Sequence, residues 1–266
     1  MGFVELSSDY SLWILISLSL FAFVAGFIDS VVGGGGLIQL PALLINLPNQ
    51  PLPTLFGTNK IAALSGTSIA AIQYSRRIKY NLPLLFVISA SAFAASFMGA
   101  RAVSLIRVDT LKPIILVILI LIAIYTFLKK DLGSVESKQI TLQKQMLFGS
   151  LIGLVVGFYD GFFGPGTGSF FVLGFVVVLG FEFVKASAYA KIVNCMTNIS
   201  ALVVFIRQGN FLLGLAFLMA VFNIAGSVIG SRIALHKGNR FIKSIFLAVV
   251  ILMILRYGYD VWQMMR

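Results

Sequence analysis

Long runs of residues without a charge recur along this chain, and they constrain its fold more than any other feature. Because 59% of the 266 residues are hydrophobic and the mean hydropathy is +1.01, an ordinary soluble domain is excluded. The sequence predicts an all-helical, polytopic membrane protein. The uncharged runs long enough to approach or cross a bilayer are Tyr10 to Ile28, Asn81 to Ala100, Pro113 to Leu128, Gln145 to Tyr159, Gly161 to Phe181, Ile192 to Ile206 and Gln208 to Ser231.

The charged residues, the cysteine and the histidine argue against nucleic-acid binding, disulfide bonds and metal binding. The net charge is +11, but the basic residues cluster in short loops between apolar runs, which favours a topological role over nucleic-acid binding. A single cysteine, Cys195, excludes an internal disulfide, and the only histidine, His236, lies in the basic loop HKGNR. We therefore expect no metal site and no cofactor. No cleavage site follows the first apolar run, so we expect it to remain as a helix.

The chain contains an internal repeat with an offset of 131 residues. At that offset GFIDSVVGGG aligns with GFYDGFFGPG, and five charged residues fall on the same residue type without a gap. Charges are sparse here, so this agreement indicates two homologous halves. The coinciding charges are Asp29 with Asp160, Lys60 with Lys191, Arg76 with Arg207, Arg101 with Arg232, and Lys112 with Lys243.

Each half is predicted to contain a long helix, a Gly-rich break, a short apolar segment, a turn and three further helices. In the first half, the segment LPNQPLPT with its prolines marks the turn. The repeats are residues 1–128 and 146–266, joined by a polar cytoplasmic linker at 129–145. This gives about eight full spans plus two short segments near the middle of the membrane. In the first half we expect helices at about 11–28, 36–47, 58–75, 82–103 and 112–128.

The distribution of basic residues bears on the orientation of the halves. If the short segments cross, the second half is inverted, and the cytoplasmic side holds 12 Lys and Arg residues against six outside. If the short segments enter the membrane and return to the same side, the repeats are parallel. The cytoplasmic side then holds 10 Lys and Arg residues against eight outside. The positive-inside rule favours the inverted repeat with both termini outside.

The motifs themselves resemble a known family. GFIDSVVGGGG, followed by TNK and a helix ending in RR, returns as GFYDGFFGPGTGS followed by AKIVNCMTN. These doubled motifs resemble the TauE/SafE-type sulfite exporter family of bacterial membrane transporters over nearly the whole chain. The resemblance implies an inner-membrane protein that moves small anions such as sulfite or organosulfonates. In the second copy, Pro165 and Ala190 differ from the residues at the equivalent positions of the first. The residues that match the motifs of the family, and that the resemblance implies are functional, are Asp29, Gly33, Gly34, Gly35, Gly36, Asn59, Lys60, Asp160, Gly164, Gly166 and Lys191.

The Gly-rich breaks allow two interpretations. Broken helices in a membrane leave backbone groups that protein, water or ligand must satisfy, and the N-terminus of the following short helix favours an anion. On this interpretation Gly33 to Gly36 in one half, with Gly164, Gly166 and Thr167 in the other, help to bind substrate. Alternatively, the glycines only permit close helix crossings.

Two intramembrane lysines are the strongest candidates for binding an anion. Between Tyr10 and Arg76 the only charged residues are Asp29 and Lys60. A buried ammonium needs a partner or an aqueous cavity, and Lys191 recurs at the same repeat position. The alternative is that both lysines lie in the first turn of a helix and reach the membrane surface by snorkelling.

Other polar residues accompany these lysines. Asn59 precedes Lys60, and Asn194 and Asn198 follow Lys191 at helical spacing, where they can line a pore or join helices by hydrogen bonds. Asp29 and Asp160 are expected at the ends of the long helices. There a carboxylate can cap the short helix, pair with a lysine or carry a coupled proton.

These features together predict a secondary transporter of a small anion, such as sulfite, an organosulfonate or a related oxyanion or carboxylate, working by alternating access. A passive anion channel is the first alternative. A membrane-embedded enzyme has little support, because the sequence contains neither HExxH nor GxSxG. We expect a small anion and the lipid bilayer as partners and no nucleic acid. The oligomeric state is left open, a homo-oligomer included.

Overall fold

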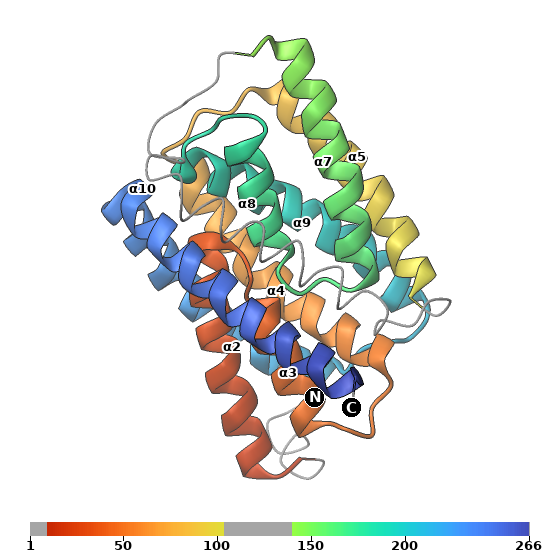
Figure 1. Ribbon diagram of the computed structural model, residues 1–266. Coiled ribbons are helices and arrows are strands. Elements are labelled where there is room, and N and C mark those ends of the chain that lie inside the picture. Colours follow the sequence, from red (N-terminus) through yellow and green to blue (C-terminus); the bar gives the residue numbers. More distant parts are fainter. Residues whose placement is uncertain (1–9, 104–139, 266) are drawn as a thin grey trace.

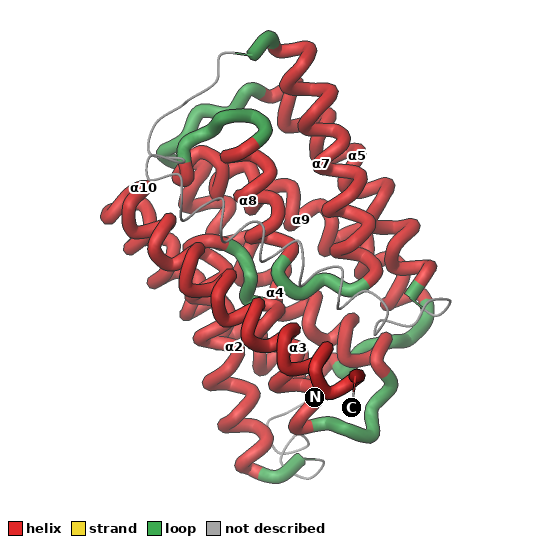
Figure 2. The backbone as a smooth tube through the Cα atoms, viewed as in Figure 1, coloured by secondary structure: helices red, strands yellow, loops and turns green. Residues whose placement is uncertain are grey.

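The computed structural model describes residues 10–103 and 140–265, and within them every regular element is a helix (Figure 1, Figure 2). The prediction of an all-helical fold is confirmed for these residues. The predicted helix at about 112–128 and most of the linker lie outside them. The helices are α2 (Leu12–Val32), α3 (Gly36–Asn46), α4 (Leu52–Ser75), α5 (Leu82–Ala102), α7 (Leu142–Phe162), α8 (Thr167–Val177), α9 (Phe183–Arg207) and α10 (Leu213–Met265).

The helix bounds repeat along the chain. The short helices α3 and α8 have 11 residues each and begin at Gly36 and Thr167, 131 positions apart. The same offset separates the starts of α4 and α9, and of α5 and α10. In Figure 1, α2 runs upward from the lower end of the molecule and α7 runs downward from the upper end. These two helices, which correspond to each other in the repeat, therefore run in opposite directions in this view.

The two halves are interleaved. Helix α5 packs mainly against α7, and its counterpart α10 packs mainly against α2, so each half supplies a helix to the other. These crossings are close because glycines lie at the contacts. A Cβ atom added at Gly157 would lie 2.6 Å from the carbonyl oxygen of Ala92, and one at Gly226 would lie 2.0 Å from that of Phe23. Small residues thus allow the helix backbones to touch, as is common in membranes.

Helix α4 begins earlier than the sequence analysis predicted, at Leu52 rather than near residue 58. Prolines had indicated a turn here, but Pro51 is the N-cap and Pro53 lies in the first turn, where the missing N–H costs nothing. Lys60 is consequently in the third turn of the helix. Lys191 occupies the same place in α9, which begins at Phe183.

Two further boundaries differ from prediction. Helix α2 continues to Val32, one turn beyond Asp29, because it ends only where Gly33 adopts φ 74°. The basic segment around His236 is not a separate loop. It is helical on both sides of a kink at Gly238, whose φ of 71° and ψ of −159° interrupt α10.

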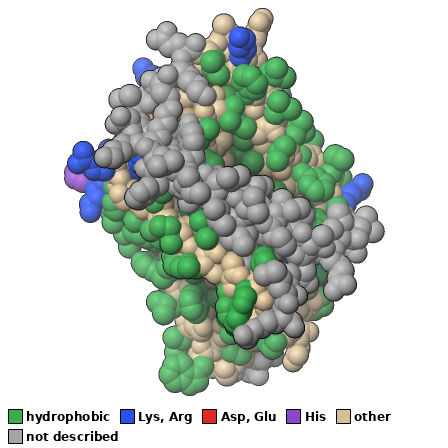
Figure 3. All heavy atoms as spheres, viewed as in Figure 1, with side chains coloured by type: hydrophobic (Ala, Val, Ile, Leu, Met, Phe, Trp, Pro, Cys, Tyr) green, Lys and Arg blue, Asp and Glu red, His purple; other side chains and the backbone are tan. Residues whose placement is uncertain are grey.

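Five of the described helices are long and apolar enough to cross a membrane: α2, α5, α7, α9 and the Leu213–Leu252 part of α10. Helix α4 is equally long but carries more polar residues. Large apolar side chains point outward, including Trp13 and Phe86, which are 81% and 74% exposed. Figure 3 shows such side chains over the described part of one face, with Lys and Arg at its edges. The number of spans and the membrane orientation of the halves stay predictions.

Candidate functional site

The two Gly-rich breaks meet inside the fold. Gly33 in the first break has φ 74°, and a Cβ atom added there would lie 2.4 Å from the Cα atom of Gly168 in α8. A side chain at Gly33 is therefore excluded by both backbone conformation and space. The breaks follow α2 and α7 and precede the short helices, so this contact brings the corresponding parts of the two halves together.

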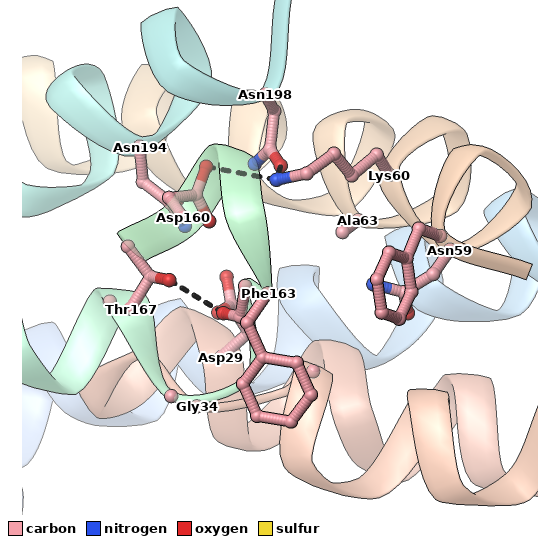
Figure 4. Close-up of a pocket in the computed structure, with 15 residues that line it drawn as sticks. Asp29, Gly34, Asn59, Lys60, Ala63, Asp160, Phe163, Thr167, Asn194 and Asn198 are labelled. Carbon is pink, nitrogen blue, oxygen red and sulfur yellow. Dashed lines mark hydrogen bonds and ion pairs between the residues drawn. The ribbon is translucent and has the colours of Figure 1, made fainter. Parts of the chain in front are cut away.

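Lys60 of α4 and Asp160 of α7 form a buried ion pair beside this contact. The Lys60 Nζ atom lies 2.9 Å from Asp160 Oδ2, and the two side chains are 5% and 3% exposed. Lys60 also donates a hydrogen bond to Asn198 Oδ1 of α9, at 3.1 Å. Figure 4 shows the ammonium group pointing toward both partners. Two charges removed from water in this way are strongly interdependent, because either one alone would be costly to bury.

Lys191 of α9 and Asp29 of α2 form a second pair with a different geometry. The Lys191 Nζ atom lies 3.8 Å from Asp29 Oδ2, and it donates a hydrogen bond to the Asp29 backbone oxygen. The Asp29 carboxylate also accepts a hydrogen bond from the Thr67 hydroxyl, at 2.8 Å. Lys191 is fully buried, whereas the Asp29 side chain is 13% exposed.

The two ion pairs are related by the repeat and cross between its halves. The offset of 131 residues converts Lys60 into Lys191 and Asp29 into Asp160. Each lysine pairs with the aspartate of the other half, so the pairing ties the halves to each other. Along the sequence, Asp29 is the acidic residue nearest to Lys60. The structure instead gives Lys60 a partner 100 residues away.

A small cavity lies against the Lys60–Asp160 pair (Figure 4). The space available to the centre of a water-sized sphere is about 30 Å³, enough for one or two waters. One buried polar atom nearby, Asn59 Oδ1, has no hydrogen-bond partner within residues 10–103 and 140–265. The lining residues are Asp29, Gly34, Gly36, Phe56, Asn59, Lys60, Ala63, Asp160, Phe163, Gly164, Gly166, Thr167, Gly168, Asn194 and Asn198.

Most of the residues that the sequence singled out are brought to this cavity, and three are not. Gly33 contacts α8, Gly35 packs against Ala25 and Asp29, and Lys191 lies behind Asp29 without lining the cavity. The lining residues that the sequence analysis did not name are Phe56, Ala63, Phe163 and Gly168. The sequence contained one indication for Gly168, because the GTGS segment places this glycine directly after the second Gly-rich break. The two phenylalanines and the alanine are indistinguishable in sequence from ordinary core residues.

Two sequence-based alternatives are not what the structure shows. The lysines lie in the third turns of α4 and α9 and are 4% and 0% exposed, so neither snorkels to a surface. The aspartates do not cap the short helices: the N-caps are Gly35 and Gly166, and neither makes a side-chain capping bond. The carboxylates pair with lysines instead.

Chemically, the cavity combines one cation and two carboxylates, those of Asp29 and Asp160, with neutral hydrogen-bonding groups. Lys60 supplies the cation, and the side chains of Asn194, Asn198 and Thr167 surround it. The backbone of both glycine breaks also reaches the cavity, where it can approach a ligand closely. Such a set can hold a small anion, provided that the anion replaces Asp160 as the partner of Lys60.

Comparison with known proteins agrees with the motifs. The profile of the family described as "Sulfite exporter TauE/SafE" matches residues 18–257. A "probable membrane transporter protein ORF9" of Sinorhizobium sp is 40% identical, with 95% of both chains covered. The "probable membrane transporter protein YfcA" of Escherichia coli K12 is 37% identical, with 90% of this chain and 87% of that protein covered. No solved structure gives a significant match.

Proposed function

Because the chain belongs to the TauE/SafE sulfite exporter family, a family of membrane transporters, we propose that it is a secondary transporter of a small anion. The substrate class is sulfite, an organosulfonate or a related oxyanion or carboxylate. The observation that carries the proposal is Lys60, a buried cation at the edge of a cavity where two broken helices meet. A buried ammonium group needs an anionic partner, which is Asp160 in this structure and would be the substrate once the anion is bound.

The composition of the cavity supports an anionic substrate. An oxyanion that leaves water must recover its hydration energy from hydrogen-bond donors and a counter-charge. The amide groups of Asn59, Asn194 and Asn198 offer donors, and Lys60 offers a full positive charge. Three residues do not contact the substrate in this proposal but pack against residues that line the cavity: Gly33, Gly35 and Lys191.

The size of the cavity supports a transporter rather than an open pore. About 30 Å³ holds one or two waters, so an oxyanion fits only after the groups around Lys60 move apart. We propose that this rearrangement belongs to an alternating-access cycle. The opposite directions of α2 and α7 support the inverted repeat on which such cycles are commonly built. We further propose that the protein lies in the bacterial inner membrane with both termini outside.

Ligand-dependent stabilisation of the purified protein tests the substrate class. Sulfite, thiosulfate, methanesulfonate, isethionate and acetate are compared by thermal shift, because a ligand that binds only the folded state raises the apparent stability. We expect sulfite or a sulfonate to raise Tm in the wild type. The Lys60→Met/Asp160→Asn double variant, which removes both members of the pair and leaves no unpaired charge, should show no shift.

Transport in proteoliposomes separates a transporter from a channel. A secondary transporter accumulates the anion against its gradient when an opposing ion gradient is imposed, whereas a channel only dissipates the gradient. We expect accumulation by the wild type and none by the double variant at matched protein content. If no anion of the panel binds or moves, the proposal is wrong.

A further inference from the structure

The charges at the cavity sum to zero before any substrate binds. Two lysines and two aspartates form the pair of crossed ion pairs, and none of them is more than slightly exposed. A buried site of low polarity does not accept one additional negative charge without compensation. The sequence alone suggested that the lysines were free to supply that compensation, but each is already neutralised by an aspartate of the other half.

We infer that Asp160 takes up a proton when a monovalent anion replaces it at Lys60, so that the protein moves one proton together with each anion. This inference deepens the proposed function and rests on it. The carboxylate Oδ2 atom that faces Lys60 receives the proton from water on the side from which the anion arrives. The same proton returns to water on the other side, when the anion leaves and the ion pair forms again.

The hydrogen bonds of the two aspartates explain why the proton is assigned to Asp160 and not to Asp29. Among the described residues, the Asp160 carboxylate accepts a hydrogen bond only from Lys60. Once an anion occupies Lys60, the buried carboxylate loses its ammonium partner, and a proton removes its charge. Asp29 differs because it retains the Thr67 hydroxyl and Lys191, which does not line the cavity.

Other titratable groups around the cavity leave this assignment unchanged. On the helices that pack around Asp160, the ionisable side chains near it are Lys60 on α4, Asp29 on α2, and Lys191 and Cys195 on α9. Cys195 lies 3.7 Å from the Ser68 hydroxyl. Tyr159, on the same helix as Asp160, donates its hydroxyl hydrogen to the Pro165 carbonyl oxygen and does not line the cavity.

The charge balance also selects the substrate. With a monovalent anion bound, Lys60 is positive, the anion is negative and Asp160 is neutral, so the net charge of the site is still zero. A divalent anion would leave the site with one negative charge. The inference therefore favours monovalent anions, namely sulfonates and hydrogensulfite, over divalent sulfite and thiosulfate.

Methanesulfonate is the probe for the test, because it stays fully ionised and releases no proton of its own. Its binding to wild-type protein is measured between pH 6 and pH 9 by titration calorimetry, and proton uptake is followed with a dye in weak buffer. One proton taken up per anion makes the apparent affinity fall about tenfold per pH unit. The same dye inside proteoliposomes should report protons arriving with methanesulfonate.

The Asp160→Asn variant should bind methanesulfonate with no dependence on pH and no proton uptake, because the amide keeps the shape but does not titrate. Glu182→Gln is the matched control: this acid accepts a hydrogen bond from Asn239 and does not line the cavity, so wild-type proton uptake is expected.

Methanesulfonate binding to the wild type without a proton would overturn this inference and leave the proposed function standing. So would proton uptake in Asp160→Asn equal to that of the wild type. Failure of the wild type to bind methanesulfonate or any other anion of the panel overturns the proposed function, and the inference with it. The wild-type measurements decide the matter even where a variant fails to fold.

Discussion

Removing one partner of the Lys60–Asp160 pair should destabilise the protein far more than removing both. In Lys60→Met the Asp160 carboxylate loses its only hydrogen-bond donor among the described residues while it stays 3% exposed. An uncompensated buried charge of this kind costs about 3–5 kcal/mol, whereas a pair replaced by neutral groups costs little. The Lys60→Met/Asp160→Asn double variant should therefore be more stable than Lys60→Met.

The expected effect on stability can be stated as a coupling energy between the two residues of each pair. We expect about 3 kcal/mol between Lys60 and Asp160, which corresponds to a difference in Tm of roughly 6–12 °C for a chain of this size. The equivalent cycle with Lys191→Met and Asp29→Asn should give a smaller coupling. Its two charged groups lie 3.8 Å apart, and Asp29 keeps the Thr67 hydrogen bond.

Thermal unfolding of the four proteins of each cycle in one detergent gives these energies. The measurement is repeated at lower pH, because protonation of a buried carboxylate removes its unpaired charge. Relative to the wild type, the stability of Lys60→Met should therefore recover as the pH falls. A Lys60→Met protein as stable as the wild type at neutral pH would refute this prediction, because it would show that the pair is not held in a charged, desolvated state.

Three other predictions follow from the packing and the repeat. Gly161→Ala should lower Tm, because its Cβ atom would lie 1.9 Å from a backbone oxygen of α5. Gly258→Ala, whose Cβ atom would meet no described residue within 4 Å, should not. In a background without the native cysteine, Arg77→Cys and Gln208→Cys occupy equivalent repeat positions that are both exposed. An inverted repeat places them on opposite sides of the membrane, so labelling of both from one side contradicts it. Asn81→Ala removes the N-cap hydrogen bond of α5 and should cost about 1 kcal/mol in thermal unfolding.

The helices could be predicted from the sequence because their signals are local. Apolar runs give the positions of α2, α5, α7 and α9, and the offset of the repeat anticipates the equal lengths of α3 and α8. The prediction of a helix boundary from local signals failed where the same residue type occurs in two kinds of local structure. Proline marks turns but also begins helices, so the start of α4 was predicted one and a half turns late.

The sequence by itself also determined which residues carry the chemistry. Charges are so sparse in the apolar tracts that Asp29, Lys60, Asp160 and Lys191 stand out without any structure, and the cost of burying them requires partners. Only the tertiary structure decided which residue is the partner of each of these charges. Lys60 pairs with Asp160 rather than with Asp29 because the halves interleave and the two breaks touch at Gly33 and Gly168. A pairing across 100 residues depends on how helices cross in space, and hydropathy or spacing along one chain carries no information about that.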